Sequence, residues 1–137
     1  GIYEGAFGGV VHEEMDNHQL NADQQTKIEK RYTVSLPSLF RKFQVPPVID
    51  YFSLDVEGTE HLIMKDFPFQ DYQINILTVE RPKEDLKMLF GKNGLVYVMN
   101  LTAWGETLWV HKSTIAAGLT TEKVKKIVHD ICQKSCY

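Results

Sequence analysis

The sequence lacks long hydrophobic runs and lacks any excess of basic charge. No stretch approaches the ~20 consecutive apolar residues that a membrane-spanning helix needs, so we predict no membrane span. With 15 basic and 18 acidic residues the formal net charge is −3. That charge offers no basic field for nucleic acid. Lys123, Lys125 and Lys126 form a local basic group, which we interpret as the solvated face of a helix.

Cysteine is also scarce. The chain holds two, Cys132 and Cys136, which would share one face of a helix. Two thiols are too few for a structural zinc site, so we interpret both as free thiols that do not define the redox compartment. The first residues lack the basic region and long apolar segment of a signal peptide. A cytoplasmic location is therefore the default expectation.

The order of hydrophobic segments predicts an α/β fold. A polar stretch at 16–30 is interpreted as a loop. Strands are predicted at 8–14, 31–36, 48–56, 74–80, 95–101 and 106–112, and helices at 35–43, 59–67, 81–94 and 120–134. Alternation of this kind is typical of a mostly parallel sheet with right-handed crossovers. The short turn between the last two strands predicts an antiparallel pair that closes one edge, followed by a C-terminal amphipathic helix.

Acidic residues stand where two of the predicted buried strands end. Asp55 and Glu57 come at the end of the apolar run 48–56, and Glu80 ends the strand 74–80. Ligands of parallel α/β sheets bind beyond the carboxyl ends of the strands, so we predict a site there. A near-continuous apolar run such as 48–56 also predicts a central strand covered on both faces.

The residues themselves leave the roles of these acids open. Asp55 either serves a ligand or caps the following helix. Glu57 either joins Asp55 around a ligand or favours the positive end of that helix. Glu80 either faces Asp55, which would raise the pKa of one carboxyl group, or pairs with Arg81 or Lys83. A metal-dependent hydrolase using the three acids is a further alternative, although no pair of histidines supports a metal site.

The segment IDYFSLDVEGTEHLIMKDF, at 49–67, resembles the signature of the FkbM-family methyltransferases. In that family an apolar strand ends in an Asp-x-Glu-Gly-x-Glu run, and a helix follows. The resemblance continues through ILTVERP, GLVYVMN and ETLWVHKS, and covers roughly residues 31–113. The upstream TVSLPSLFRKF is similar to a short helix of the family, with Pro37 and Ser38 in place of the usual acids.

The resemblance implies a Rossmann-like, S-adenosylmethionine-dependent enzyme that methylates hydroxyl oxygens of sugars or other small molecules. It implies that Asp55 lies near both the methyl donor and the substrate. Asp55, Glu57 and Glu80 are then the expected catalytic acids. The residues expected to bind the substrate are Glu60 and His61, just after the acidic run, and Trp104, in the last turn.

The cofactor-binding half of the family has no recognisable counterpart in the sequence. Gly5, Gly8 and Gly9 are interpreted as turn glycines, because no buried strand precedes them. We expect an N-terminal strand and polar loop at 1–30, the C-terminal half of the methyltransferase domain at 31–113, and a helix with its tail at 114–137. A missing N-terminal half or a second copy in a homo-oligomer would complete the sheet. The alternative is a catalytically inactive remnant or an interaction domain.

Overall fold

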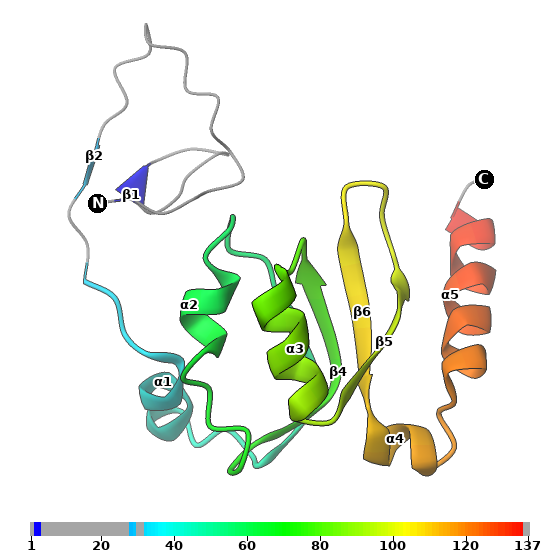
Figure 1. Ribbon diagram of the computed structural model, residues 1–137, viewed down its shortest axis with the longest axis horizontal. Helices are drawn as coiled ribbons and strands as arrows, with labels where there is room; N and C mark the ends of the chain where they lie inside the picture. Colours follow the sequence, from blue (N-terminus) through cyan, green and yellow to red (C-terminus); the bar gives the residue numbers. More distant parts are fainter. Residues whose placement is uncertain (1, 4–27, 30–31, 136–137) are drawn as a thin grey trace, which may run out of the picture.

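The computed structural model describes the backbone of residues 2–3, 28–29 and 32–135 and the side chains of residues 32–133. Its centre is a four-stranded sheet in the order β3–β4–β6–β5 (Figure 1). The strands are β3 (Val48–Leu54), β4 (Gln73–Glu80), β5 (Leu95–Asn100) and β6 (Glu106–His111). β3 and β4 pair in parallel, and β6 runs antiparallel to both of its neighbours. The predicted α/β class with a closing antiparallel pair is confirmed.

Two groups of helices pack on the two faces of this sheet. One face carries α1 (Leu36–Lys42), α2 (Glu60–Met64) and α3 (Glu84–Lys92). The other face carries α4 (Lys112–Ala116) and the amphipathic α5 (Thr121–Ser135), which pack against β5 and β6. None of the described helices is long and apolar enough to cross a membrane.

Aromatic side chains fill the core beneath α1, α2 and α3. Phe40 of α1 makes edge-on ring contacts with Phe52, Phe67 and Tyr72, whose centroids lie 5.2–6.2 Å away. Phe90 of α3 is fully buried and meets Trp109 of β6 at 5.4 Å. These contacts hold α1 and α3 on one face of the sheet.

The predicted start of α1 is confirmed, and the start of α3 differs from the prediction. Ser35 is the N-cap residue of α1 and a proline occupies its first turn, as predicted. In α3 the N-cap is Lys83, so Pro82 precedes the helix rather than lying in its first turn. Gly94, at φ +84°, follows the C-cap of α3, in a conformation that favours glycine.

Several predicted elements differ from the structure. Residues 32–35 form no strand, because they find no partner strand and their side chains are exposed. The polar stretch 16–30 contains β2 (Ile28–Glu29), which pairs with β1 (Ile2–Tyr3). The short helix α4 was not predicted. The strand predicted at 8–14 and the three early glycines lie outside the described residues.

The features predicted for the C-terminal helix are partly confirmed. Lys123, Lys125 and Lys126 are exposed on α5, as a solvated face requires. Cys132 is a free, exposed thiol. Cys136 lies outside the described residues.

β3 is an edge strand of the described sheet, not the central strand that its apolar run predicted. Its neighbour is β4 on one side only. Val48 and Tyr51 are 51% and 56% exposed, because no described helix covers their part of the sheet. An exposed apolar edge of this kind is a surface on which further strands pair.

The core makes a direct prediction for stability. Phe90→Ala removes a fully buried ring that contacts Trp109, and we expect a loss of about 3–5 kcal/mol in the free energy of unfolding. The matched control is Met88→Ala on the same helix, whose side chain is 60% exposed. It should change stability by no more than about 0.5 kcal/mol. Urea unfolding with unchanged m-values measures both, and equal losses would show that α3 does not pack as described.

Candidate functional site

The structure brings the predicted acids together at the carboxyl ends of β3 and β4. We call this region, with Asp55, Glu57 and Glu80, the acidic edge. Asp55 follows β3 directly and Glu80 is the last residue of β4. The parallel register pairs Leu54 with Val79, so the next residues of both strands lie side by side. Asp55 and Glu57 both lie close enough to Glu80 to act electrostatically on its carboxyl group.

Glu80 has the most perturbed electrostatics of this edge. Its pKa is raised above the ordinary value, first because burial penalises the charged carboxylate. The neighbouring carboxylates of Asp55 and Glu57 raise that pKa further, while the positive charge of Arg81 opposes them. The Nη2 atom of Arg81 lies 3.0 Å from Oε1 of Glu80. Glu80 therefore makes both contacts that the sequence left open, one with Asp55 and one with Arg81.

The loop between β3 and α2 is held by a buried glutamate. Glu60 is 5% exposed, and its Oε1 accepts hydrogen bonds from the backbone N–H groups of Val56 and Gly58 at 3.1 and 3.3 Å. The hydroxyl of Thr59 donates to the carbonyl of Val56 at 3.0 Å. The observed contacts of Glu60 are thus with its own loop, and its predicted contact with substrate stays a prediction.

Both strand ends at this edge are followed by residues in the left-handed region. Glu57 has φ +56° and Arg81 has φ +40°. A side chain in this conformation costs of order 1–3 kcal/mol, which the surrounding contacts must offset. For Glu57 those contacts are the bonds that Glu60 and Thr59 make to the loop. For Arg81 they include the N–H bond to the carbonyl of Gly105, at 3.0 Å.

The remaining predicted residues surround the same edge. His61, at the start of α2, lines a shallow depression together with Arg81 and Lys83. Trp104 is 67% exposed in the turn between β5 and β6. That turn reaches the acidic edge because β6 begins at Glu106, which is the register partner of Glu80. Among residues 32–133, no three His, Cys, Asp or Glu side chains are grouped so that they could hold a metal ion.

Sequence reasoning missed the role of Gly105. Its φ is +98°, and a Cβ atom there would lie 2.9 Å from Cγ of Arg81. Glycine therefore lets the turn approach the arginine closely. The signal in the sequence was a glycine directly after Trp104 in a short hairpin turn. The position of Arg81 against it depends on strand order, which the sequence did not reveal.

The family model of the methyltransferase FkbM domain matches residues 3–92, about two thirds of the chain. The chain belongs to the methyltransferase FkbM domain family. The match includes the loop between β3 and α2 (residues 55–59, the acidic loop), β4 and α3. It confirms the family suggested by the Asp-x-Glu-Gly-x-Glu run. No curated protein and no solved structure gives a significant match.

The acidic edge lies within the residues that match the FkbM family model. In this FkbM domain the groups that meet there are Asp55, Glu57 and Glu80, with Arg81 beside them. The matched residues end at the last residue of α3, so the β5–β6 pair that carries Trp104 lies outside the match.

The electrostatics of Glu80 predict opposite shifts in two variants. Asp55→Asn removes a neighbouring negative charge and should lower the pKa of Glu80 toward its ordinary value. Arg81→Gln removes the positive charge that opposes the shift and should raise the pKa further. Carbon-detected NMR titration of the Glu80 carboxyl group measures both shifts. A pKa of Glu80 that does not move in Asp55→Asn would contradict the close approach of Asp55 to Glu80.

The raised pKa also predicts how stability depends on pH. Folded Glu80 binds its proton more tightly than unfolded Glu80, so this group stabilises the fold below its unfolded pKa. That contribution is lost as the pH rises through the folded pKa. The unfolding free energy should therefore fall less steeply with rising pH in Glu80→Gln than in the parent protein. Urea unfolding at several pH values measures this difference. An equal fall in both proteins would show that other groups cause the pH dependence.

The buried glutamate predicts a local stability effect. Glu60→Ala leaves the N–H groups of Val56 and Gly58 without their acceptor, and should cost about 1–3 kcal/mol of unfolding free energy. Glu60→Gln keeps an acceptor oxygen and should retain most of that stability. The control is Glu84→Ala, since the side chain of Glu84 is 83% exposed and pairs only on the surface. A loss in the control as large as that in Glu60→Ala would contradict the loop-holding role.

Proposed function

We propose that this FkbM domain is part of an S-adenosylmethionine-dependent O-methyltransferase that acts on a hydroxyl group of a small molecule or sugar. The observation that carries the proposal is the meeting of Asp55 and Glu80 at the carboxyl ends of two paired parallel strands, where the carboxyl group of Asp55 contributes to the raised pKa of Glu80. Ligands of such sheets bind at these ends, and perturbed carboxyl groups there are candidates for acid–base work. Membership in a methyltransferase family limits that work to methyl transfer.

In this proposal the acid pair accepts the proton of the acceptor hydroxyl. A carboxylate with a raised pKa is a stronger base than an ordinary one, so Glu80 is suited to take that proton. Asp55 is exposed at the end of β3, where it can accept a hydrogen bond from the hydroxyl and orient it. Arg81 orients the carboxylate of Glu80 through its 3.0 Å ion pair. Glu60 acts as a positioning residue, because it holds the loop that presents Asp55 and Glu57.

The acidic edge also fits the chemistry of the proposed methyl donor. S-adenosylmethionine supplies an activated methyl group on a positively charged sulfur, and it carries a positively charged ammonium group. Carboxylates attract such charges, so Asp55 is the residue that we assign to contact with the donor. His61 and Trp104 border the same edge, and we assign them to the acceptor.

A second candidate is an interaction domain that keeps the methyltransferase fold without its activity. The exposed edge of β3 supports it, since Val48 and Tyr51 present apolar surface beside unpaired strand. Under this alternative the edge pairs with another polypeptide and the acid pair has no substrate.

Calorimetric titration of S-adenosylmethionine into the 137-residue protein separates the two candidates. We expect saturable binding that Asp55→Ala weakens by about tenfold or more, because a carboxylate that contacts a buried positive charge contributes roughly 1.5–3 kcal/mol. The matched control is Asp71→Ala. Asp71 is an exposed acid that precedes the amino end of β4, whereas Glu80 lies at the carboxyl end of that strand. This control variant should leave binding unchanged.

Absence of binding by a protein that is folded, as shown by its circular dichroism, would contradict the enzyme proposal for this chain. Equal weakening by Asp55→Ala and Asp71→Ala would mean a diffuse electrostatic attraction instead of a site.

A further inference from the structure

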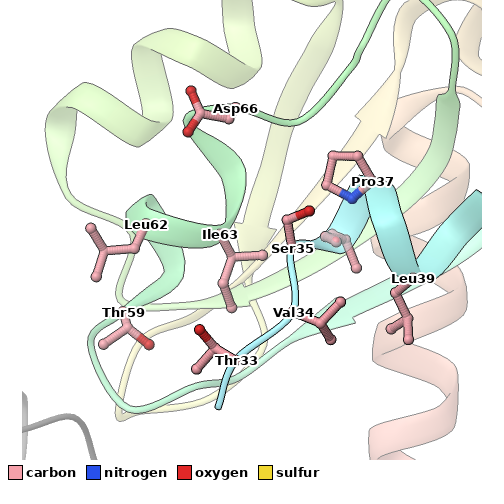
Figure 2. A pocket seen from close by; sticks show the side chains of 10 residues that line it. Thr33, Val34, Ser35, Pro37, Leu39, Thr59, Leu62, Ile63 and Asp66 are labelled. Carbon is pink, nitrogen blue, oxygen red and sulfur yellow. The ribbon is translucent and has the colours of Figure 1, made fainter.

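A groove of about 620 Å³ lies beside the acidic loop, between α2 and the extended segment that leads into α1. Figure 2 shows Leu62 and Ile63 of α2 on one side, and Val34 and Leu39 on the other. Its volume falls within the roughly 300–1,000 Å³ of small-molecule sites. Val34 is 64% exposed and Leu39 is 37% exposed, so the groove presents apolar surface to solvent.

The groove begins at the acidic loop. Thr59 forms part of its lining, and the same residue binds the carbonyl of Val56 within that loop. In Figure 2, Thr33 and Thr59 lie at one end of the groove, whereas Pro37 and Asp66 lie at the other. A ligand lying along the groove would therefore have one end next to the residues that follow β3.

Apolar side chains line the middle of the groove, and its polar groups lie mainly at the two ends. Thr33 and Thr59 are at one end and Asp66 is at the other (Figure 2). The hydroxyl of Thr59 donates to the carbonyl of Val56 at 3.0 Å, and the hydroxyl of Ser35 donates to Ser38 at 2.9 Å. Binding a sugar requires several donors and acceptors directed at its hydroxyl groups, because polar groups that lose water must regain hydrogen bonds. The apolar side chains that line the groove suit a hydrocarbon chain better.

We propose that this groove binds the aliphatic part of the acceptor, which is thereby a hydroxylated aliphatic compound rather than a sugar. The hydroxyl group lies at the Thr59 end, toward Asp55 and Glu80, and the hydrocarbon extends along Leu62, Ile63 and Val34. The inference rests on the proposed function for its orientation. Occupation of the groove by a hydrocarbon chain is tested independently of methyl transfer.

The test is an NMR titration of the whole protein with 1-octanol, observing the methyl groups of leucine, isoleucine and methionine. We expect saturable shifts at Leu62 and Ile63, and none with methyl α-glucoside. Leu62→Gln should weaken octanol binding about tenfold, because an amide replaces apolar contact surface. Val34→Gln should weaken it similarly, and its exposed side chain contributes little to folding. The matched control is Met88→Gln, an exposed position on α3 outside the groove.

The outcomes separate this inference from the proposed function. Octanol binding that survives in Asp55→Asn and Glu80→Gln, while S-adenosylmethionine fails to bind, would support the groove and contradict the enzyme. Binding of the glucoside in place of octanol would overturn the aliphatic acceptor. Octanol shifts that spread to Met88, or that persist unchanged in both groove variants, would overturn the site. A dimer in sedimentation that Val34→Gln dissociates, with no effect of octanol, would show that a second copy occupies the groove.

Discussion

The parallel pairing of β3 with β4 is the constraint on which the rest of the site depends. Two strands that run side by side in the same direction end at the same edge, so the residues after Leu54 and Val79 become neighbours. Asp55 and Glu80 are 25 positions apart in the chain, yet Asp55 contributes to the raised pKa of Glu80. Without this register the carboxylates of Asp55 and Glu57 would add nothing to the raised pKa that burial gives Glu80.

Two residues with strained backbone conformations, and the contacts that offset the strain, lie next to Asp55 and Glu80. Glu57 and Arg81 adopt left-handed backbone conformations, three residues beyond the end of β3 and one residue beyond the end of β4. The carboxylate of Glu60 offsets the first by binding two loop amides, and the close approach of Gly105 accommodates the second. Backbone conformations of this type persist where surrounding contacts over-determine them, which is common near functional sites. The rigid loop and the hairpin turn thus support the same acidic edge from opposite sides.

The two faces and two edges of the sheet are not equally covered. The face under α1, α2 and α3 carries a packed aromatic core, and β6 is inserted between β4 and β5. At the other edge β3 leaves Val48 and Tyr51 exposed. The apolar groove is a second open feature, beside the loop between β3 and α2. Exposed apolar surface of this kind is suited to bind a further molecule or polypeptide.

Local patterns in the sequence determined the element types and the chemical nature of the site. Hydrophobic periodicity predicted β3, β4, α3, α5 and the β5–β6 pair as elements. In β4, α3 and β6 most of the apolar residues that the period selects are buried, whereas on α5 Val124 is buried but Ile127 and Ile131 are 50% and 58% exposed. The Asp-x-Glu-Gly-x-Glu run, followed by a strand that ends in Glu80, was sufficient to suggest the family that the family model confirms. The sequence also placed Asp55 and Glu80 at strand ends, which is where their ligand was expected.

Only the tertiary structure decided the arrangement of these parts. The insertion of β6 between its neighbours brings Gly105 against Arg81, and this depends on strand order, which no local pattern encodes. β3 lies at an edge of the sheet, although its apolar run predicted a central strand. The hydrophobic pattern identifies apolar residues, but it does not show which strands or helices lie next to them. The groove beside α2 depends on side chains from segments that meet only after folding, whereas the printed bonds of Glu60 lie within its own loop. The long-range pairing of β3 with β4, rather than local sequence, makes Asp55 and Glu80 neighbours.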